Sequence, residues 1–326
     1  MLTLDLIKEN LNLQNHLYVA YSGGPDSSVL LDLCVKLRDA SNINLSAIHI
    51  NHNLSKKSID WENHCVNECK KLNVNLIIES VQINSDGGGL ESAARQARYK
   101  IFENILKENE QIVLGHHSDD VAETIFMRIL RGTGLDGIEG PAHKRNIGQG
   151  KLIRPLIRVP KTEIMNYLRD NKLNFIEDDT NEDIRFDRNF LRHKIFPLLE
   201  DRWKDFPKRI NSLSSISKDR NENYKILVYE KFEQLIGSKI ILKDLKKIPK
   251  SLAIDVIRYS IKECNLAIPN SKIMEEIYKT FVASRPGPKS CVTWSRADKE
   301  DFSGMIKYEE GNLITVSYTH LTLPTS

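Results

Sequence analysis

An apolar run, a glycine turn and a helical pattern follow one another near the beginning of this 326-residue chain. The run Leu17–Tyr21 leads into Ser-Gly-Gly-Pro-Asp-Ser at residues 22–27, and apolar residues recur at helical spacing from Val29. The N-terminus of such a helix binds anions, and two adjacent glycines let a polyphosphate approach the backbone closely. The turn has no lysine, so it is not the Gly-Lys-Ser/Thr loop that contacts a γ-phosphate. Asp26 instead suggests a carboxylate that holds Mg²⁺ on phosphates, whereas a common glycine–serine turn without a ligand is the alternative.

Short apolar runs and helical patterns alternate through residues 1–150. Strands are predicted at 17–21, 45–50, 75–81 and 111–115, and helices at 27–40, 58–72, 91–107 and 119–131. This alternation predicts a parallel sheet with helices on both faces. Ligands of such sheets bind outside the carboxyl ends of the strands, so Ser22, His49 and His116 are expected to lie near one another.

The length of 326 residues favours two domains. We expect a catalytic domain at 1–204, a linker helix at 205–222 and a smaller accessory domain, α/β or mostly helical, at 223–315. Residues 316–326 are uncharged and rich in threonine, and we expect a non-native tail there, beyond which the natural chain would continue.

Composition limits the expected cellular location and the expected mode of nucleic-acid binding. No stretch approaches eighteen apolar residues, and five cysteines give no disulfide framework, so a cytoplasmic protein is expected. The formal charge is only +3, so any affinity for nucleic acid must come from local basic patches.

Two further segments carry polar side chains at predicted strand or helix ends. His49, Asn51 and His52 follow the second predicted strand, and we favour a binding role for this cluster over a purely structural one. Arg95 and Arg98 are three residues apart, so one helix face presents both guanidinium groups, which bind phosphates well. A solvent-exposed face with a Glu91–Arg95 pair explains the same spacing equally well.

The segment from His116 to Glu123 holds two histidines and three acids. Zinc would need a further imidazole or thiolate, and the nearby sequence offers none. Asp120 and Glu123, three apart at the start of a helix, suit Mg²⁺ or an ammonium group better. Helix capping by Ser118 or Asp119 is the structural alternative.

Weaker signals follow. A glycine-rich loop begins at Arg131, although glycine after a helix is a routine stop signal. Arg188 and Arg192, four residues apart, could contact a phosphate or a base, and a plain basic helix is equally compatible.

Seven blocks taken together resemble the tRNA(Ile)-lysidine synthetases, a branch of the PP-loop family of ATP pyrophosphatases. They occur in order between about residues 15 and 200, at Ser22–Ser27, His49–His52, Glu91–Tyr99, His116–Thr124, Arg131–Leu135, Arg154–Leu156 and Glu177–Arg192. Departures are few: Asn53 stands where the family usually has glycine, Val121 where it has glutamine and Thr133 where it has serine.

The resemblance implies a Rossmann-like PP-loop domain and a two-step reaction. The C2 oxygen of the cytidine at the first anticodon position attacks the α-phosphate of ATP, and the ε-amine of free L-lysine then displaces AMP. ATP and Mg²⁺, a tRNA(Ile) with a CAU anticodon and lysine are the implied ligands, and a homodimer is one possible assembly.

The resemblance, with the chemistry above, also implies roles for individual residues. The expected catalytic residues are Asp26, Asp120, Glu123, His116 and Arg95, where either carboxylate or His116 would deprotonate lysine. The expected nucleotide-binding residues are Ser22, Gly23, Gly24, Pro25, Asp26, Ser27, His49, Asn51 and His52, with Asp26 also as the metal ligand. The expected substrate-binding residues are Arg98, Arg131, Arg188 and Arg192.

Three alternatives remain open. A PP-loop tRNA thiolase needs reactive cysteines or an iron–sulfur site, and the chain has Cys65 and Cys69 four apart but no Cys-x2-Cys pair. A non-catalytic nucleotide-binding module would explain the glycine turn alone. A small-molecule amidoligase would require an ammonia source, for which no cysteine-based glutaminase motif is present.

Overall fold

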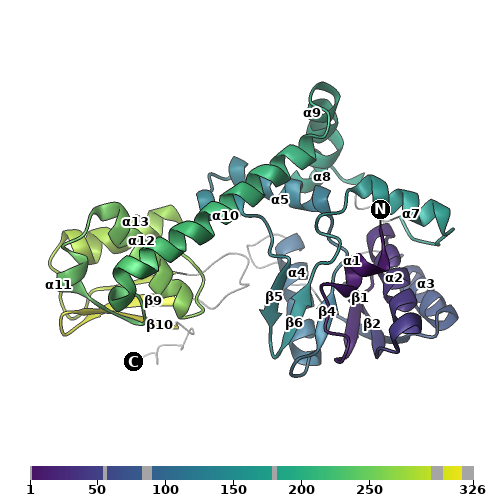
Figure 1. The fold of residues 1–326 in the computed structure, drawn as a ribbon, viewed down its shortest axis with the longest axis horizontal. Coiled ribbons are helices and arrows are strands. Elements are labelled where there is room, and N and C mark those ends of the chain that lie inside the picture. The colour runs from purple at the N-terminus through teal and green to yellow at the C-terminus, as the bar shows by residue number, and fades with distance from the viewer. Residues whose placement is uncertain (1, 54–56, 83–89, 178–181, 295–303, 318–326) are drawn as a thin grey trace. The chain divides into compact units, whose positions relative to one another are not determined.

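The computed structural model describes the chain apart from residues 1, 54–56, 83–89, 178–181, 295–303 and 318–326 (Figure 1). The chain divides into two compact units, Met1–Lys218 and Asp219–Ser326. Within the described residues, no helix is both long and apolar enough to cross a membrane.

A six-stranded sheet forms the centre of the N-terminal unit (Figure 1). Its strands are β1 Leu17–Ala20, β2 Leu45–Asn51, β3 Asn75–Ser80, β4 Gln111–Val113, β5 Lys144–Ile147 and β6 Gly150–Ile153. Their order is β3-β2-β1-β4-β6-β5, and every neighbouring pair is parallel except β5 and β6. The predicted parallel sheet is therefore confirmed.

The first helices of this unit alternate with the strands along the chain, and the later helices follow the last strand. They are α1 Leu4–Lys8, α2 Pro25–Ser41, α3 Ser58–Lys71, α4 Leu90–Ile105, α5 Ser118–Leu130, α6 Leu135–Ile138, α7 Lys161–Asp170, α8 Asp187–Phe190, a π-helical turn Leu191–Ile195 and α9 Phe196–Arg202. The four predicted βα pairs coincide with β1–α2, β2–α3, β3–α4 and β4–α5, with small shifts of their ends.

Alternating residues of β1 enter two different cores, as expected for a central strand. Leu17 and Val19 belong to the core that contains the apolar residues of α2, and Tyr18 belongs to the core that contains Tyr99 and Phe102 of α4. Helices therefore cover both faces of the sheet, which explains why its central strands are nearly continuous in apolar character.

The hairpin β5–β6 was not anticipated from the sequence. Gly148, with φ +51°, and Gln149 connect the two strands, a two-residue loop that favours a left-handed first residue. Only Ile147 of β5 is buried, so the edge strand lacks the apolar pattern by which strands are recognised.

Helix α10, Phe206–Phe232, contains the whole predicted linker helix 205–222 except its first residue, and the two units divide within it. The C-terminal unit continues with a 3-10 turn Glu233–Leu235, β7 Lys239–Ile241, α11 Leu242–Leu245, α12 Lys250–Glu263, α13 Ser271–Ile277, a π-helical turn Tyr278–Ala283, β8 Cys291–Trp294, β9 Gly304–Glu309 and β10 Asn312–Ser317. Its strands form an antiparallel sheet in the order β7-β10-β9-β8. Val316 and Ser317, the first two residues of the predicted tail, pair with β9, and the rest of that tail lies outside the described residues.

Candidate active site

The loop between β1 and α2 is a turn fixed by its own side chains. Gly24 is the N-cap of α2, and Gly23 has φ +82°, a left-handed conformation that glycine adopts without strain. The Ser27 hydroxyl donates to the Gly24 carbonyl at 3.0 Å and accepts from the Ser22 N–H at 3.3 Å. The Ile176 N–H donates to the Gly23 carbonyl at 2.8 Å, which ties a distant loop to the turn. The turn is thus held in place before any ligand binds.

The end of β4 lies directly against this turn. A Cβ at Gly115 would come within 3.0 Å of the Asp26 carbonyl group and 3.2 Å of the Ser27 nitrogen, so only glycine fits without displacing the backbone. His116, the next residue, is consequently placed beside the first turn of α2. The structure also brings His49 to β1, since its Nδ1 lies 3.0 Å from the Tyr21 carbonyl oxygen. The carboxyl ends of β1, β2 and β4, which were expected to lie near one another, do lie near one another.

Asp26 is paired with a lysine that sequence reasoning missed. The Lys161 Nζ lies 2.5 Å from Asp26 Oδ1, and the Lys161 backbone N–H donates to Asp119 Oδ2 at 2.9 Å. Lys161 is the first residue of α7, where the helix dipole disfavours a positive charge. A lysine at the start of a predicted helix was the sequence signal that could have revealed this contact, because its charge is stabilised there only by a partner from elsewhere in the fold. A turn without a lysine of its own therefore acquires one from a segment far along the chain.

His117, rather than Ser118 or Asp119, caps helix α5. Its Nδ1 accepts from the Asp120 N–H at 3.4 Å, while Asp120 Oδ2 accepts from the His117 N–H at 3.0 Å. This reciprocal pair is a capping box with histidine in the place of serine or threonine. One oxygen of Asp120 is therefore used to start the helix.

Asp120 and Glu123 on α5 form an ion-pair cluster with two arginines. Arg188 donates to Glu123 at 2.6 Å and to Asp120 at 2.8 Å, and Arg192 donates to Glu123 at 2.7 and 2.8 Å. Glu123 is only 2% exposed, and these contacts satisfy its carboxylate in place of water. Although burial alone raises the pKa of Asp120, the neighbouring His117 and Arg188 outweigh it and lower that pKa. Asp120 and Glu123 were expected to bind an ammonium group, and the two arginines were expected to bind phosphate. In this structure the carboxylates and the guanidinium groups bind each other.

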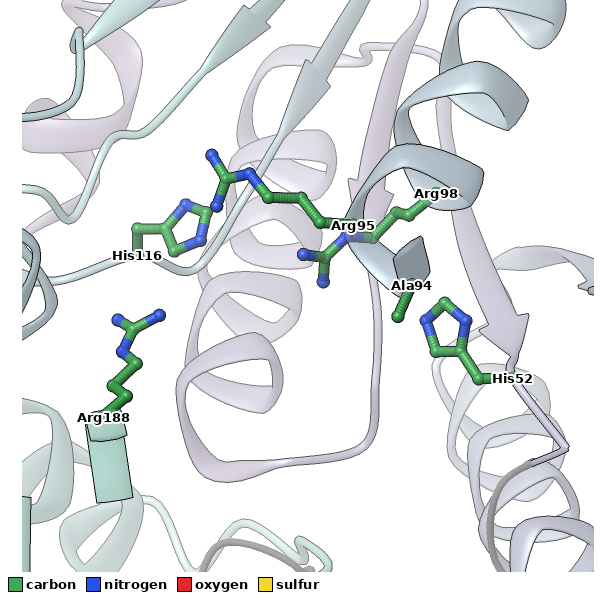
Figure 2. A pocket seen from close by; sticks show the side chains of 6 residues that line it. All are labelled: His52, Ala94, Arg95, Arg98, His116 and Arg188. Atoms are coloured by element: carbon green, nitrogen blue, oxygen red, sulfur yellow. The ribbon is translucent and has the colours of Figure 1, made fainter. Parts of the chain in front are cut away.

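A cavity of about 260 Å³ opens between α4, the end of β4 and α8 (Figure 2). Its lining residues are His52, Ala94, Arg95, Arg98, His116 and Arg188. In Figure 2 the Arg98 guanidinium group lies between the two imidazoles, and the guanidinium groups of Arg95 and Arg188 lie on the His116 side. No carboxylate lines it in the part of the chain that the structure describes. This composition suits an anionic ligand such as a phosphate group.

Both imidazoles of the cavity are kept neutral at physiological pH. Burial lowers the pKa of His52 to about 4, with smaller contributions from Arg98 and His49. Burial also lowers the pKa of His116 well below its ordinary value, and Arg154 reinforces this effect. The Nδ1 of His52 is buried and has no hydrogen-bond partner among the described residues, so a ligand in the cavity could supply one.

The ring of Tyr99 organises the arginines beside the cavity. The guanidinium carbons of Arg95, Arg98 and Arg145 lie 5.0, 5.9 and 4.7 Å from its centroid, within the range of cation–π contact. Arg154 donates to its hydroxyl at 3.3 Å. Arg145 was not anticipated because it comes from the edge strand β5, which sequence reasoning did not find.

Three expected site residues contact other parts of the protein and do not line the cavity. Asn51 donates to Glu62 at 2.9 Å and accepts from the Asn53 N–H at 2.9 Å, which shapes the turn after β2. His49 is buried and held by the Tyr21 carbonyl. Arg131 is 69% exposed, lies 3.7 Å from Asp187 and is not part of the cavity lining.

The residues around Asp26 fit a Mg²⁺ ion that is bound mainly by phosphate oxygens. Such ions keep several waters and need only one or two carboxylates from the protein. Asp26, whose side chain is 29% exposed, can provide one once Lys161 moves aside. Groups of three or more histidine, cysteine, aspartate or glutamate residues arranged for a metal are absent from the described residues, so a protein-only metal cage is not supported there.

The buried cysteines are not reactive thiols. All five are free, and burial raises the pKa of Cys34, Cys65 and Cys69 to about 12. Thiols with such pKa values are protonated at neutral pH and are poor nucleophiles. Sulfur chemistry at Cys65 and Cys69 therefore has no support in this geometry.

Comparisons with known proteins agree with this site. The PP-loop domain family matches residues 3–199. The tRNA(Ile)-lysidine synthase of Legionella pneumophila (strain Paris) is 31% identical over 302 residues, covering 91% of this chain and 70% of that protein. That of Buchnera aphidicola subsp. Schizaphis graminum is 35% identical over 270 residues, 82% of this chain and 60% of that protein. That of Coxiella burnetii (strain RSA 493) is 42% identical over 188 residues, 57% of this chain and 42% of that protein.

A solved structure gives the fold independently. The U34-tRNA thiolase NcsA from Methanococcus maripaludis superposes with a TM-score of 0.54 at 18% identity, covering 66% of this chain and 77% of that one. At this identity the likeness concerns the fold alone. Because the matching family covers residues 3–199 and the curated relatives share one name over most of the chain, this chain belongs to the tRNA(Ile)-lysidine synthase family of PP-loop proteins.

Proposed function

We propose that this protein ligates free L-lysine to C2 of the cytidine at the first anticodon position of a tRNA(Ile) with a CAU anticodon. ATP binding follows from the PP-loop family, and ATP would be converted to AMP and pyrophosphate. The observation that carries the proposal is the cavity with three guanidinium groups, since His116 on its wall adjoins Gly115, which contacts the glycine turn. An anion held there lies next to the predicted triphosphate site.

The first step requires stabilisation of the negative charge on the phosphates as the cytidine oxygen attacks. The backbone N–H groups of the glycine turn and the hydroxyl of Ser22, 3.1 Å from that of Ser27, are preorganised donors, whereas the Ser27 proton is already donated to the Gly24 carbonyl. Lys161 adds an ammonium group beside Asp26. A Mg²⁺ bound to Asp26 and the phosphates would supply further charge neutralisation. Arg95 and Arg98 would bind phosphate oxygens from the other side.

The second step requires an ammonium group to be bound and to lose a proton. Asp120 and Glu123 adjoin the cavity wall, because Arg188, which lines the cavity, contacts both of them. A lysine ammonium that binds there takes the place of one guanidinium contact, after which Arg188 can contact phosphate. This exchange reconciles the two roles expected from the sequence.

The proposal is tested by incubating the protein with ATP, radiolabelled lysine and a transcript of tRNA(Ile) with a CAU anticodon. Lysine incorporation together with pyrophosphate release supports it, and a transcript with uridine at the first anticodon position is the control. Pyrophosphate release without incorporation would point to another nucleophile such as sulfur. ATP binding without any release would instead indicate a nucleotide-binding module.

Lys161 offers a sharper test of the nucleotide site. Lys161→Gln is expected to weaken ATP binding by roughly 10- to 150-fold, because one charge-assisted contact to phosphate contributes about 1.5–3 kcal/mol. Lys151, an exposed lysine on β6, supplies the matched control Lys151→Gln, which should bind ATP as the unaltered protein does. Equal affinities for ATP in both variants would exclude Lys161 from the site.

A further inference from the structure

Arg154 is a buried arginine whose contacts leave it little freedom. It is 2% exposed and follows β6 directly. One terminal nitrogen donates to the Ala142 carbonyl at 2.6 Å and the other to the Tyr99 hydroxyl at 3.3 Å. Its backbone N–H also donates to the His143 carbonyl at 2.8 Å. The remaining nitrogen, Nε, is therefore held in one direction.

That direction is toward His116. The Arg154 Nε lies 3.1 Å from His116 Nδ1. A guanidinium group has only donors and stays protonated in proteins, so it can only donate in this contact. Nδ1 must then be the acceptor and carry no proton. A neutral imidazole with an acceptor at Nδ1 has its proton on Nε2, and the contact thus fixes the tautomer.

The charges around His116 favour the same state. Asp120 on α5 favours the protonated ring, whereas Arg154 after β6, Arg98 on α4 and Arg188 on α8 oppose it. Burial opposes protonation more than any of these charges. The ring is consequently neutral, and it faces the cavity that the guanidinium groups line (Figure 2).

We propose that Arg154 is a positioning residue that holds His116 in the Nε2–H tautomer, so that His116 donates a hydrogen bond to an oxygen of the anion bound in the cavity. His116 is then not the base that deprotonates lysine, because Nε2 already carries a proton and Nδ1 is occupied by Arg154. Proton removal falls to Asp120 or Glu123. The tautomer stands on the geometry alone, while the identity of the oxygen, from ATP or from the cytidine, rests on the proposed function.

The tautomer is tested by nitrogen NMR of protein labelled with ¹⁵N-histidine, with His116→Gln used to assign the signals. The expected result is an unprotonated Nδ1 and a protonated Nε2 for His116 that do not titrate between about pH 5.5 and 8. A protonated Nδ1, or titration near the ordinary histidine pKa of about 6.5, would overturn the proposal. This measurement needs neither tRNA nor turnover, so it fails or succeeds separately from the proposed reaction.

Variants of Arg154 and Tyr99 distinguish a role of Arg154 in positioning His116 from a role in packing alone. Arg154→Met should let His116 titrate and populate both tautomers, and Tyr99→Phe, which removes only the hydroxyl contact, should leave the His116 signals unchanged. If Arg154→Met folds and leaves the tautomer unchanged, the positioning role is wrong. If it does not fold, the spectra of the unaltered protein and of Tyr99→Phe still decide the tautomer.

The donor role has its own readout in lysine incorporation. His116→Gln keeps an N–H donor near the position of Nε2 but cannot act as a base, whereas His116→Ala has neither function. We expect His116→Gln to retain at least tenfold more activity than His116→Ala, with an unaltered pH profile. Equal loss in both variants would contradict the donor role of His116.

Discussion

The buried carboxylate of Glu123 allows one energetic prediction to be worked out in detail. Replacement by glutamine keeps the shape of the side chain but removes its charge. Glu123 is 2% exposed and contacts Arg188 at 2.6 Å and Arg192 at 2.7 and 2.8 Å. The four-residue cluster, which also includes Asp120, then changes from formally neutral to a net charge of about +1.

The magnitude follows from the surroundings of the charges. Removal of one partner from a buried ion pair costs about 3–5 kcal/mol because the remaining charge stays desolvated. The guanidinium side chains here are 26% and 36% exposed, so water compensates part of that cost. We expect Glu123→Gln to lower the free energy of unfolding by about 2–3 kcal/mol. With a urea dependence of about 2–3 kcal/mol per molar for a unit of this size, the midpoint falls by about 1 M.

The assay is equilibrium unfolding in urea, followed by circular dichroism and tryptophan fluorescence and fitted with one transition for each unit. Only the transition of the N-terminal unit should move. The matched control is Asp187→Asn, since Asp187 is 77% exposed and its pair with Arg131 spans 3.7 Å. That exposed pair should contribute less than about 1 kcal/mol.

Equal midpoints for Glu123→Gln and Asp187→Asn would refute the electrostatic reasoning. A double-mutant cycle gives a second check, because Arg192→Met removes one of the two cations left uncompensated by Glu123→Gln. The combined variant should recover at least about 1 kcal/mol relative to the sum of the single changes. Strict additivity would mean that the two side chains do not interact in solution.

Three further predictions follow from other parts of the structure. Gly115→Ala should weaken ATP binding at least tenfold in a titration, because its Cβ would press on Asp26 at 3.0 Å, while Gly287→Ala, with open space around it, should have no effect. Alkylation by iodoacetamide at about pH 8 should modify the exposed Cys291 first, and mass spectrometry of the peptides should find Cys34, Cys65 and Cys69 unmodified in the folded protein, because the pKa values of those three thiols are near 12. The pKa of Asp120 is lowered from 3.8 on folding, so its charge stabilises the fold at neutral pH; the stability gap to Asp120→Asn should persist down to about pH 4 and shrink below it, as unfolding measured against pH would show.

Much of the N-terminal unit could be predicted from the sequence because its signals are local. Each of the four predicted strands and the helix after it depends on residues within one short window, in which periodicity and turn residues agree. The strand pair β5–β6 escaped prediction because the edge strand buries only Ile147. The glycine turn identified a nucleotide site for the same local reason, since strand, turn and helix N-terminus are contiguous.

The contacts within the candidate site were mostly beyond reach of such reasoning. Asp120 and Glu123 predicted a site for Mg²⁺ or an ammonium group, and the sequence could not show that two arginines of the same chain contact these carboxylates. Arg154 appeared only as part of a family block, with no indication that it contacts His116. Charge and hydrogen-bonding capacity have no periodicity from which a distant partner can be inferred.

The sequence by itself determined the parallel sheet, the anion-binding turn and the family, because these depend on local pattern and on the order of blocks along the chain. Only the tertiary structure decided which charges meet. Lys161 reaches Asp26 across 135 residues through packing of α7 against α2, and Arg188 reaches Glu123 across 65 through packing of α8 against α5. Packing brings those helices together through their apolar faces, and the charged partners are fixed only as a consequence of that packing.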